Sequence, residues 1–361
     1  TDSHITEPPD CYNTRIDKKY KDTAPYMTHS EDFGDIFIID GMSRPVPIGL
    51  LAAAGKNPKD MSIGGTKFED IHKSGWDAKY RVADQDIDGI GAEIIYPTVG
   101  MLLCNHKDGG YKKACFDAYN LWLQEFCSEE PNRIFGLGQI AVNSVEEAIE
   151  DLRRVKAMGF VGVMMPGRPA TSFDYDSTEF DPLWEAAIDL GLPLSFHILT
   201  FSENGLDAPR GPKIGSFLSI IRGCQDIISM FIYSGVFDRF PKLQLVCAEA
   251  DAGWAAHFMH RMDHAYEYHR FWMKAPPLEK MPSDYFKENI WVTFQDDMVA
   301  FQCKDLLNIE RMCWATDFPH SDSTWPKSQS ILDAHTKHLT DDERNLICRD
   351  NTAALYNLNL S

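Results

Sequence analysis

Apolar and polar positions along the chain alternate in a repeating strand-then-helix order. Eight short runs predict strands, and most of them are apolar at almost every position, which is typical of parallel strands buried on both faces. Strands with one face in water would instead alternate apolar and polar residues. The eight runs are residues 2–5, 92–99, 134–142, 160–166, 194–198, 243–248, 290–294 and 312–316.

The segments between these runs repeat their apolar residues with a period near 3.6, which predicts helices. The clearest is 144–159, where Ser144 and Glu147 are spaced for a capping box and Gly159 is a helix stop. Residues 180–190, 220–237 and 253–273 have the same pattern. This α/β order predicts a (β/α)8 TIM barrel. A doubly wound open sheet is disfavoured because no Gly-x-Gly-x-x-Gly follows the first strand.

One barrel with insertions accounts for the whole length, so we predict a single domain over residues 1–361. Residues 10–90 form an insertion after the first predicted strand, with a small hairpin around 36–42 and a helix over 79–90. The insertion could cover the active-site mouth as a lid or form a surface excursion. Residues 328–361 predict a C-terminal helical cap.

The formal charge of −19 argues against nucleic acid and anionic membrane surfaces as partners, since both are negatively charged. No apolar run approaches the ~18 residues of a membrane span, and no signal peptide is visible at the start. Thr1 lies within a predicted strand, so we expect residues upstream of it. The nine cysteines contain no Cys-x-x-Cys pair, which favours reduced thiols and a cytoplasmic location.

Imidazole and carboxylate side chains stand at the ends of several predicted strands. Residues two apart in a strand face the same way, so Asp2 and His4 would point together into the barrel. His197 ends the fifth predicted strand. The carboxyl ends of barrel strands carry the chemistry of such enzymes, so these side chains should converge there. The full predicted metal set is Asp2, His4, Glu7, His197, Glu249 and Asp317.

Each of these residues also has a purely structural interpretation. His4 and His197 could hydrogen-bond to backbone inside the barrel, Asp317 could cap a helix, and Glu7 could orient the following loop. His320 could support the site or contact substrate, or begin a helix. Arg168 could bind a substrate carboxylate with two parallel hydrogen bonds, or be a surface arginine.

The same residues carry a resemblance to a known family. Four parts of the chain carry this resemblance. They are the opening Asp2-Ser3-His4 with Glu7-Pro-Pro-Asp, the run Pro193-Leu-Ser-Phe-His197, the run Asp317-Phe-Pro-His320 with Ser323-Thr-Trp-Pro326, and the closing Asn351-Thr-Ala-Ala-Leu-Tyr-Asn-Leu. The chain resembles the amidohydrolase superfamily, in the branch of aminocarboxymuconate-semialdehyde and γ-resorcylate decarboxylases. The resemblance implies metal ligands at Asp2, His4, His197 and Asp317.

The chain departs from the family pattern in three places. The usual His-x-His of the first strand is Asp2-x-His4, and no lysine ends the fourth strand. Glu249 stands where the decarboxylases have a catalytic histidine after the sixth strand. With one imidazole fewer and one carboxylate more, the set of donors in this chain resembles that of a small subgroup of the superfamily. Members of that subgroup hydroxylate aliphatic carbon with dioxygen at a dinuclear iron or manganese–iron site. They act on 2-aminoisobutyrate or a diterpenoid acid thioester.

Two chemistries follow from this set of donors. Two histidines with four carboxylates favour iron or manganese as the bound metal. A dinuclear centre bridged by Glu249 would support dioxygen-dependent hydroxylation of a small carboxylate or amino acid. The alternative is one divalent ion, zinc included, with Asp317 as general base, in a hydrolase or non-oxidative decarboxylase. His320 and Glu249 would assist Asp317 in catalysis. A third interpretation is a non-catalytic, metal-bearing subunit, and we expect a homodimer or a hetero-oligomer with a related chain.

Overall fold

Eight parallel strands form the centre of the structure. The computed structural model describes residues 1–201 and 211–359. The strands pair in the order β1-β5-β6-β7-β8-β9-β10-β11, and every pair is parallel. They are β1 (Ser3–His4), β5 (Glu93–Tyr96), β6 (Ile134–Gln139), β7 (Gly162–Met165), β8 (Leu194–His197), β9 (Leu245–Ala248), β10 (Ile290–Phe294) and β11 (Met312–Trp314). All eight lie within the runs predicted from the sequence.

The first and last strands of this sheet meet, which closes it. The Thr1 amine donates to the Trp314 carbonyl at 2.9 Å, and the Asp317 N–H donates to the Asp2 carbonyl at 2.9 Å. The His4 N–H donates to the Phe318 carbonyl at 2.7 Å. We call this junction between β1 and the end of β11 the seam. The fold is therefore the predicted (β/α)8 barrel.

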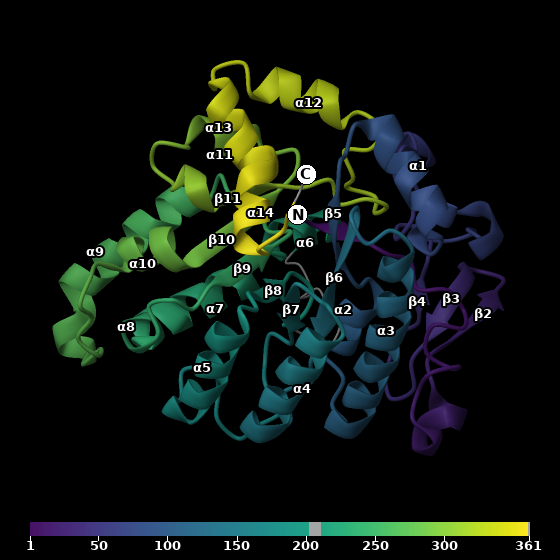
Figure 1. The fold of residues 1–361 in the computed structure, drawn as a ribbon, viewed down its shortest axis with the longest axis horizontal. Coiled ribbons are helices and arrows are strands. Elements are labelled where there is room, and N and C mark those ends of the chain that lie inside the picture. The colour runs from purple at the N-terminus through teal and green to yellow at the C-terminus, as the bar shows by residue number, and fades with distance from the viewer. Residues whose placement is uncertain (202–210, 360–361) are drawn as a thin grey trace.

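Helices follow the strands around the outside of the barrel (Figure 1). They are α1 (Ala78–Asp88), α2 (Val99–Leu103), α3 (Gly109–Glu129), α4 (Val145–Ala157), α5 (Asp181–Leu190), α6 (Ser216–Ser219), α7 (Arg222–Tyr233), α8 (Val236–Arg239), α9 (Ala255–Met273), α10 (Pro282–Asn289), α11 (Met298–Gln302), α12 (Ser328–His335), α13 (Asp341–Asn345) and α14 (Asn351–Leu355). The C-terminal segment also includes a π-helical turn, Leu346–Asp350.

The helix starts and stops differ from the prediction in three details. Ser144 caps α4 through the Glu147 N–H, but the Glu147 carboxylate accepts from Asn143 instead, so only half of the predicted capping box forms. The predicted helix 220–237 is broken at Gly235, whose φ of 71° ends α7 before α8 begins. The longest helix, α3, was not predicted; its buried face includes the polar residues Lys112 and Asn120, which blur the apolar period.

The insertion after β1 contains its own small sheet. Strands β2 (Tyr26–Ser30), β3 (Gly34–Ile38) and β4 (Val46–Pro47) are antiparallel, so the predicted hairpin at 36–42 is displaced toward the N-terminus. This sheet lies at the edge of the barrel (Figure 1). The insertion reaches the loop after β11, where the Ala54 N–H donates to the Pro319 carbonyl at 3.0 Å. Its role as a lid stays a prediction.

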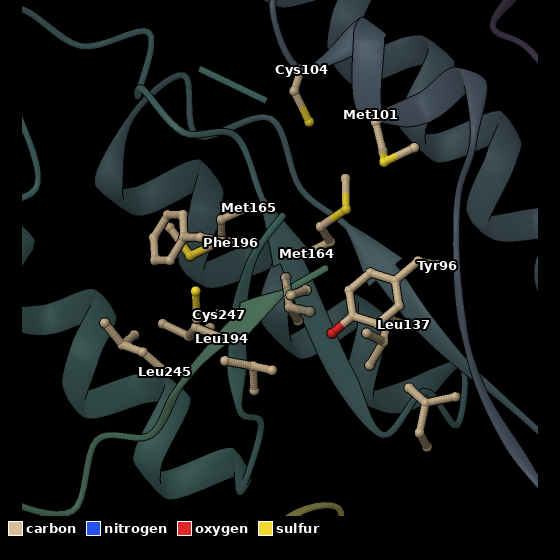
Figure 2. Packing of buried hydrophobic residues seen from close by; sticks show 14 of the residues in the cluster. Tyr96, Met101, Cys104, Leu137, Met164, Met165, Leu194, Phe196, Leu245 and Cys247 are labelled. Carbon is tan, nitrogen blue, oxygen red and sulfur yellow. The ribbon is translucent and has the colours of Figure 1, made fainter. Parts of the chain in front are cut away.

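The barrel interior is filled by side chains rather than open. Figure 2 shows Tyr96, Leu137, Met164 and Leu194 within one buried cluster. The Tyr96 hydroxyl is satisfied there by the Ser195 hydroxyl at 2.9 Å. The Tyr96 ring also lies 5.1 Å from the His197 ring, centroid to centroid, so this packed core continues to the end of β8. The core therefore forms a rigid floor beneath the strand ends.

One helical stretch, Lys213–Tyr233, is long and apolar enough to cross a membrane by length and composition alone. This finding qualifies the prediction that no such run exists. Within it, α7 packs against β8 and α10 and buries Cys224, Ile227 and Phe231, and 28% of the apolar window is buried. A single helix of this kind is weak evidence for a membrane span.

Candidate metal centre

The seam brings Asp2 and His4 to one side of the barrel's C-terminal face. Both side chains are fully buried, as expected for positions two apart that point into a barrel. The His4 Nδ1 lies 2.8 Å from the Pro97 carbonyl, so this nitrogen is the donor. In a neutral imidazole the Nε2 then carries the lone pair, and it faces the other carboxylates.

His197 and Glu249 approach the same point from β8 and β9. The His197 Nδ1 lies 3.1 Å from the Ile198 carbonyl, which again leaves Nε2 as the acceptor. Glu249 follows β9 with a positive φ of 54°, a conformation that costs a non-glycine residue free energy and clusters at functional sites. Its N–H donates to the Thr293 hydroxyl at 2.9 Å, which supports this turn.

Asp317 and His320 complete the group from the loop after β11. Asp317 has a φ of 52°, and its carboxylate is fully buried. The His320 Nδ1 lies 2.9 Å from Asp317 Oδ1, and the His320 ring stacks on His4 with 3.9 Å between centroids. The two rings therefore lie face to face next to the Asp317 carboxylate.

The donor atoms are spaced as ligands of one ion. His4 Nε2 lies 3.2 Å from Glu249 Oε2, 3.5 Å from Asp2 Oδ1 and 3.6 Å from Asp317 Oδ1. His197 Nε2 lies 3.4 Å from Asp2 Oδ1 and 3.2 Å from Glu249 Oε2. A cation with bonds of about 2.0–2.2 Å separates neighbouring ligand atoms by about 3.0–3.5 Å. The donors form two overlapping groups that share His4 and Glu249, and within each group the ligand atoms lie within 4.8 Å of one another.

Several of these buried atoms have no hydrogen-bond partner among the described residues, namely Asp2 Oδ1, His197 Nε2 and both oxygens of Asp317. Unpaired buried polar atoms are costly, so their convergence calls for a ligand. The acceptor lone pairs of two imidazoles facing three carboxylates fit a divalent cation and exclude an anion at this point.

The charges of the cluster perturb one another strongly. Burial would raise the pKa of Asp2, but His197 and His4 hold that pKa below its usual range. Burial raises the pKa of Asp317 well above its usual range, and Asp2 adds to the effect while His4 opposes it. Burial and the nearby Asp317 likewise raise the pKa of Glu249. Without a cation the cluster must retain protons, and binding one would release them.

Glu7 and Arg168 are not brought into this cluster. Glu7 is buried, and its Oε1 accepts the N–H groups of Thr98 and Gly100, each at 3.1 Å. Burial raises the pKa of Glu7. Its observed contacts are those of a residue that orients the loop after β5. Arg168 is exposed after β7, and its role with substrate stays a prediction.

Two threonines near the cluster were not predicted from the sequence. Thr293 lies on β10 and Thr98 follows β5, and both are buried. The only available signal was a hydroxyl residue within an otherwise apolar strand, Ile-Trp-Val-Thr-Phe over β10. That signal does not say which side chain the hydroxyl meets.

Comparison with known proteins places these observations in context. The family model described as amidohydrolase matches residues 110–358. A γ-resorcylate decarboxylase from Polaromonas sp. strain JS666 is 26% identical over 252 residues, which are 61% of this chain and 72% of that protein.

Solved structures share the fold. An amidohydrolase from Mycobacterium avium subsp. paratuberculosis K-10 superposes with a TM-score of 0.78 at 22% identity, covering 99% of this chain and 98% of that one. A dihydroxybenzoic acid decarboxylase from Polaromonas sp. JS666, with bound manganese and the inhibitor 2-nitroresorcinol, has a TM-score of 0.63 at 21% identity, covering 78% and 86%. The named relatives agree with an enzyme and with the decarboxylase alternative, whereas the hydroxylase expectation gains no support from them.

Proposed function

Because this chain belongs to the amidohydrolase family, as its motifs predict, we propose that it is a non-oxidative decarboxylase of a small carboxylic acid that depends on one divalent metal ion. The observation that carries the proposal is the convergence of imidazole and carboxylate donors in two groups that share His4 and Glu249. The first group is Asp2, His4, His197 and Glu249, and the second is His4, Glu249, Asp317 and His320. The proteins similar to this chain include decarboxylases, and the solved structure of one of these has bound manganese.

One ion fits the site better than two. The two groups of donors share His4 and Glu249, so one ion can be held between them. Glu7, also a predicted ligand, lies outside both groups; its Oε1 accepts two backbone N–H groups, and its Oε2 has no partner among the described residues. Manganese suits this mixture of imidazole and carboxylate donors. When bound, the ion would act as a Lewis acid toward the oxygens of the substrate.

The hydrogen bonds of His320 define where a proton is held. The Thr98 hydroxyl donates its only proton to the Ile5 carbonyl at 2.5 Å, so it must accept from His320 Nε2 at 2.9 Å. In the neutral ring His320 Nδ1 is then an acceptor, and it faces Asp317 Oδ1 at 2.9 Å. Asp317 Oδ1 has no hydrogen-bond partner among the described residues, so we infer that the pair takes up one proton, which the two atoms then share, when substrate binds.

This shared proton is what a decarboxylation consumes. When the carboxylate leaves as CO2, the electron pair of the broken C–C bond stays on the substrate carbon. The Asp317–His320 pair can deliver its proton to that carbon, and water restores it afterwards. His320 thereby takes the place of the histidine that the decarboxylase branch has at the position of Glu249.

The substrate class follows from the relatives and from the site. The Polaromonas relative is named for γ-resorcylate, and the manganese-bound structure holds a nitroresorcinol inhibitor. The cluster itself is rich in carboxylates, so a substrate carboxylate can approach it only when a cation offsets their charge. We expect hydroxylated aromatic acids to be the first class to test.

The test measures metal content, CO2 and dioxygen uptake together. Protein loaded with Mn²⁺ and incubated with 2,6-dihydroxybenzoate and related hydroxybenzoates in D2O should release CO2 and place one deuterium on the carbon that lost it. The metal content should be about one ion per chain. Asp317→Asn should abolish turnover, whereas the exposed Asp333→Asn on α12 is the matched control and should retain it.

The competing functions give different results in the same experiment. Two iron or manganese ions per chain with substrate-dependent dioxygen uptake would replace the proposal with hydroxylation. One tightly held ion with neither CO2 release nor dioxygen uptake would favour a non-catalytic subunit.

A further inference from the structure

Thr293 is a hydroxyl residue placed between two of the proposed ligands. It is fully buried on β10, whose other residues are apolar. Its hydroxyl lies 3.0 Å from Asp2 Oδ2 and 2.9 Å from the backbone nitrogen of Glu249. It therefore touches a side chain at the start of β1 and the backbone after β9.

Proton counting fixes the direction of both hydrogen bonds. The Glu249 N–H can only donate, so the Thr293 oxygen accepts from it. The single hydroxyl proton is then available for Asp2 Oδ2, which as a carboxylate oxygen accepts it. Thr293 cannot make the two bonds in any other arrangement.

These bonds determine which oxygen of Asp2 faces the centre. With Oδ2 engaged by Thr293, Asp2 Oδ1 is the oxygen that lies 3.5 Å from His4 Nε2 and 3.4 Å from His197 Nε2. Asp2 Oδ1 has no hydrogen-bond partner among the residues that the structure describes. A rotation of the carboxylate would break the Thr293 bond and remove this donor.

The second bond acts on Glu249 through its backbone. Glu249 has a φ of 54°, which is unfavourable for a residue with a side chain, and a bonded N–H opposes relaxation of this turn. If the turn relaxed, the carboxylate would move away from His4 and His197, which it now approaches to 3.2 Å.

We propose that Thr293 is a positioning residue that orients Asp2 and Glu249 together for the divalent cation. The inference rests on the proposed metal centre, because it concerns the affinity of that centre. It does not depend on which reaction follows. Hydrogen-bond partners of metal ligands typically change metal affinity by about 10–100-fold when they are removed.

The test compares Mn²⁺ binding by four metal-free proteins: the original protein, Thr293→Val, Thr293→Ser and Thr336→Val. Binding is measured by titration calorimetry and by the electron paramagnetic resonance signal of free Mn²⁺. Thr293→Val keeps the shape of the side chain and removes the hydroxyl, and we expect its affinity to fall about 10–100-fold. Thr293→Ser restores the hydroxyl and should bind within about threefold of the original protein. Thr336→Val is the matched control, because its buried hydroxyl bonds only the Leu332 carbonyl at the end of α12.

The outcomes separate the two proposals. Equal Mn²⁺ affinity in Thr293→Val and the original protein overturns the role of Thr293, as does a Ser variant as weak as the Val variant. Absence of Mn²⁺ binding in the original protein overturns the metal centre itself. Thermal unfolding of the metal-free forms checks folding, and Thr293→Ala replaces the Val variant if that one fails to fold.

Discussion

Arg81 is the buried charge on which the seam depends, and its replacement by methionine tests that dependence. Arg81 lies on α1 with no solvent exposure, and its Nε donates to Glu93 Oε2 at 2.5 Å. Its Nη1 donates to the His4 carbonyl at 2.6 Å, and its Nη2 to the Phe318 carbonyl at 3.4 Å. One guanidinium thus joins α1, β5 and both sides of the seam.

The magnitude follows from what Arg81→Met leaves behind. Glu93 is 5% exposed and would keep only the Gln85 amide and the Ser3 hydroxyl as partners. Removing one partner of a buried ion pair costs about 3–5 kcal/mol, because the other charge stays buried without compensation. For a chain of 361 residues this corresponds to a fall of about 4–7 °C in the unfolding midpoint.

The pH dependence has a definite sign. Burial would raise the pKa of Glu93, but Arg81 holds it below its usual value, so the pair stabilises the fold at neutral pH and the stabilisation is lost as pH falls through that lowered pKa. In Arg81→Met, burial is opposed only by the hydrogen bonds from Gln85 and Ser3, so the pKa of Glu93 should rise. The penalty of the substitution is then largest above that raised pKa and shrinks as the pH is lowered.

Thermal unfolding by differential scanning calorimetry at about pH 8 and about pH 5 measures this effect. Both proteins should be metal-free, so that metal binding does not add to the difference. The double variant Arg81→Met with Glu93→Gln removes the unpaired charge and should recover a large part of the lost stability. A loss of less than about 1 kcal/mol in the single variant, or an equal penalty at both pH values, would show that Arg81 does not stabilise the seam through Glu93.

Two further predictions concern side chains beside the cluster. Thr98→Val removes the acceptor that fixes the His320 ring, so kcat should fall about 10-fold or more with KM changed by less than about twofold in steady-state assays; an unchanged kcat would contradict the shared proton. Glu7→Gln retains an oxygen for the Thr98 and Gly100 N–H groups, so Mn²⁺ content and affinity should stay within about twofold. A tenfold loss of affinity in that variant would make Glu7 a ligand.

The barrel and the position of its strand ends could be predicted because burial on both faces leaves a clear mark on the sequence. The strand containing His197 is one example, with apolar neighbours and a polar final residue. Asp2 and His4 were placed on one side by the two-residue repeat alone. The family resemblance added the expected order of the motifs.

Other features depend on contacts that the sequence does not encode locally. Helix α3 buries the polar side chains of Lys112 and Asn120 on its inner face, so its apolar period is interrupted. Glu7 was expected to follow Asp2 and His4 into the cluster, but the chain turns after Ile5 and places it against backbone N–H groups after β5. The role proposed for Thr293 depends on its hydrogen bond to Asp2, which lies 291 positions away in the sequence, so the sequence around Thr293 does not indicate it.

The seam also has a consequence for biosynthesis. Thr1 and Trp314, which hydrogen-bond across it, are separated by 313 positions, so contacts of this range form late and slowly during folding. A nascent polypeptide still lacking β11 already has Asp2, His4, His197 and Glu249 but not Asp317 or His320. The proposed centre would therefore reach its full set of donors only after the last strand has been synthesised and paired with the first.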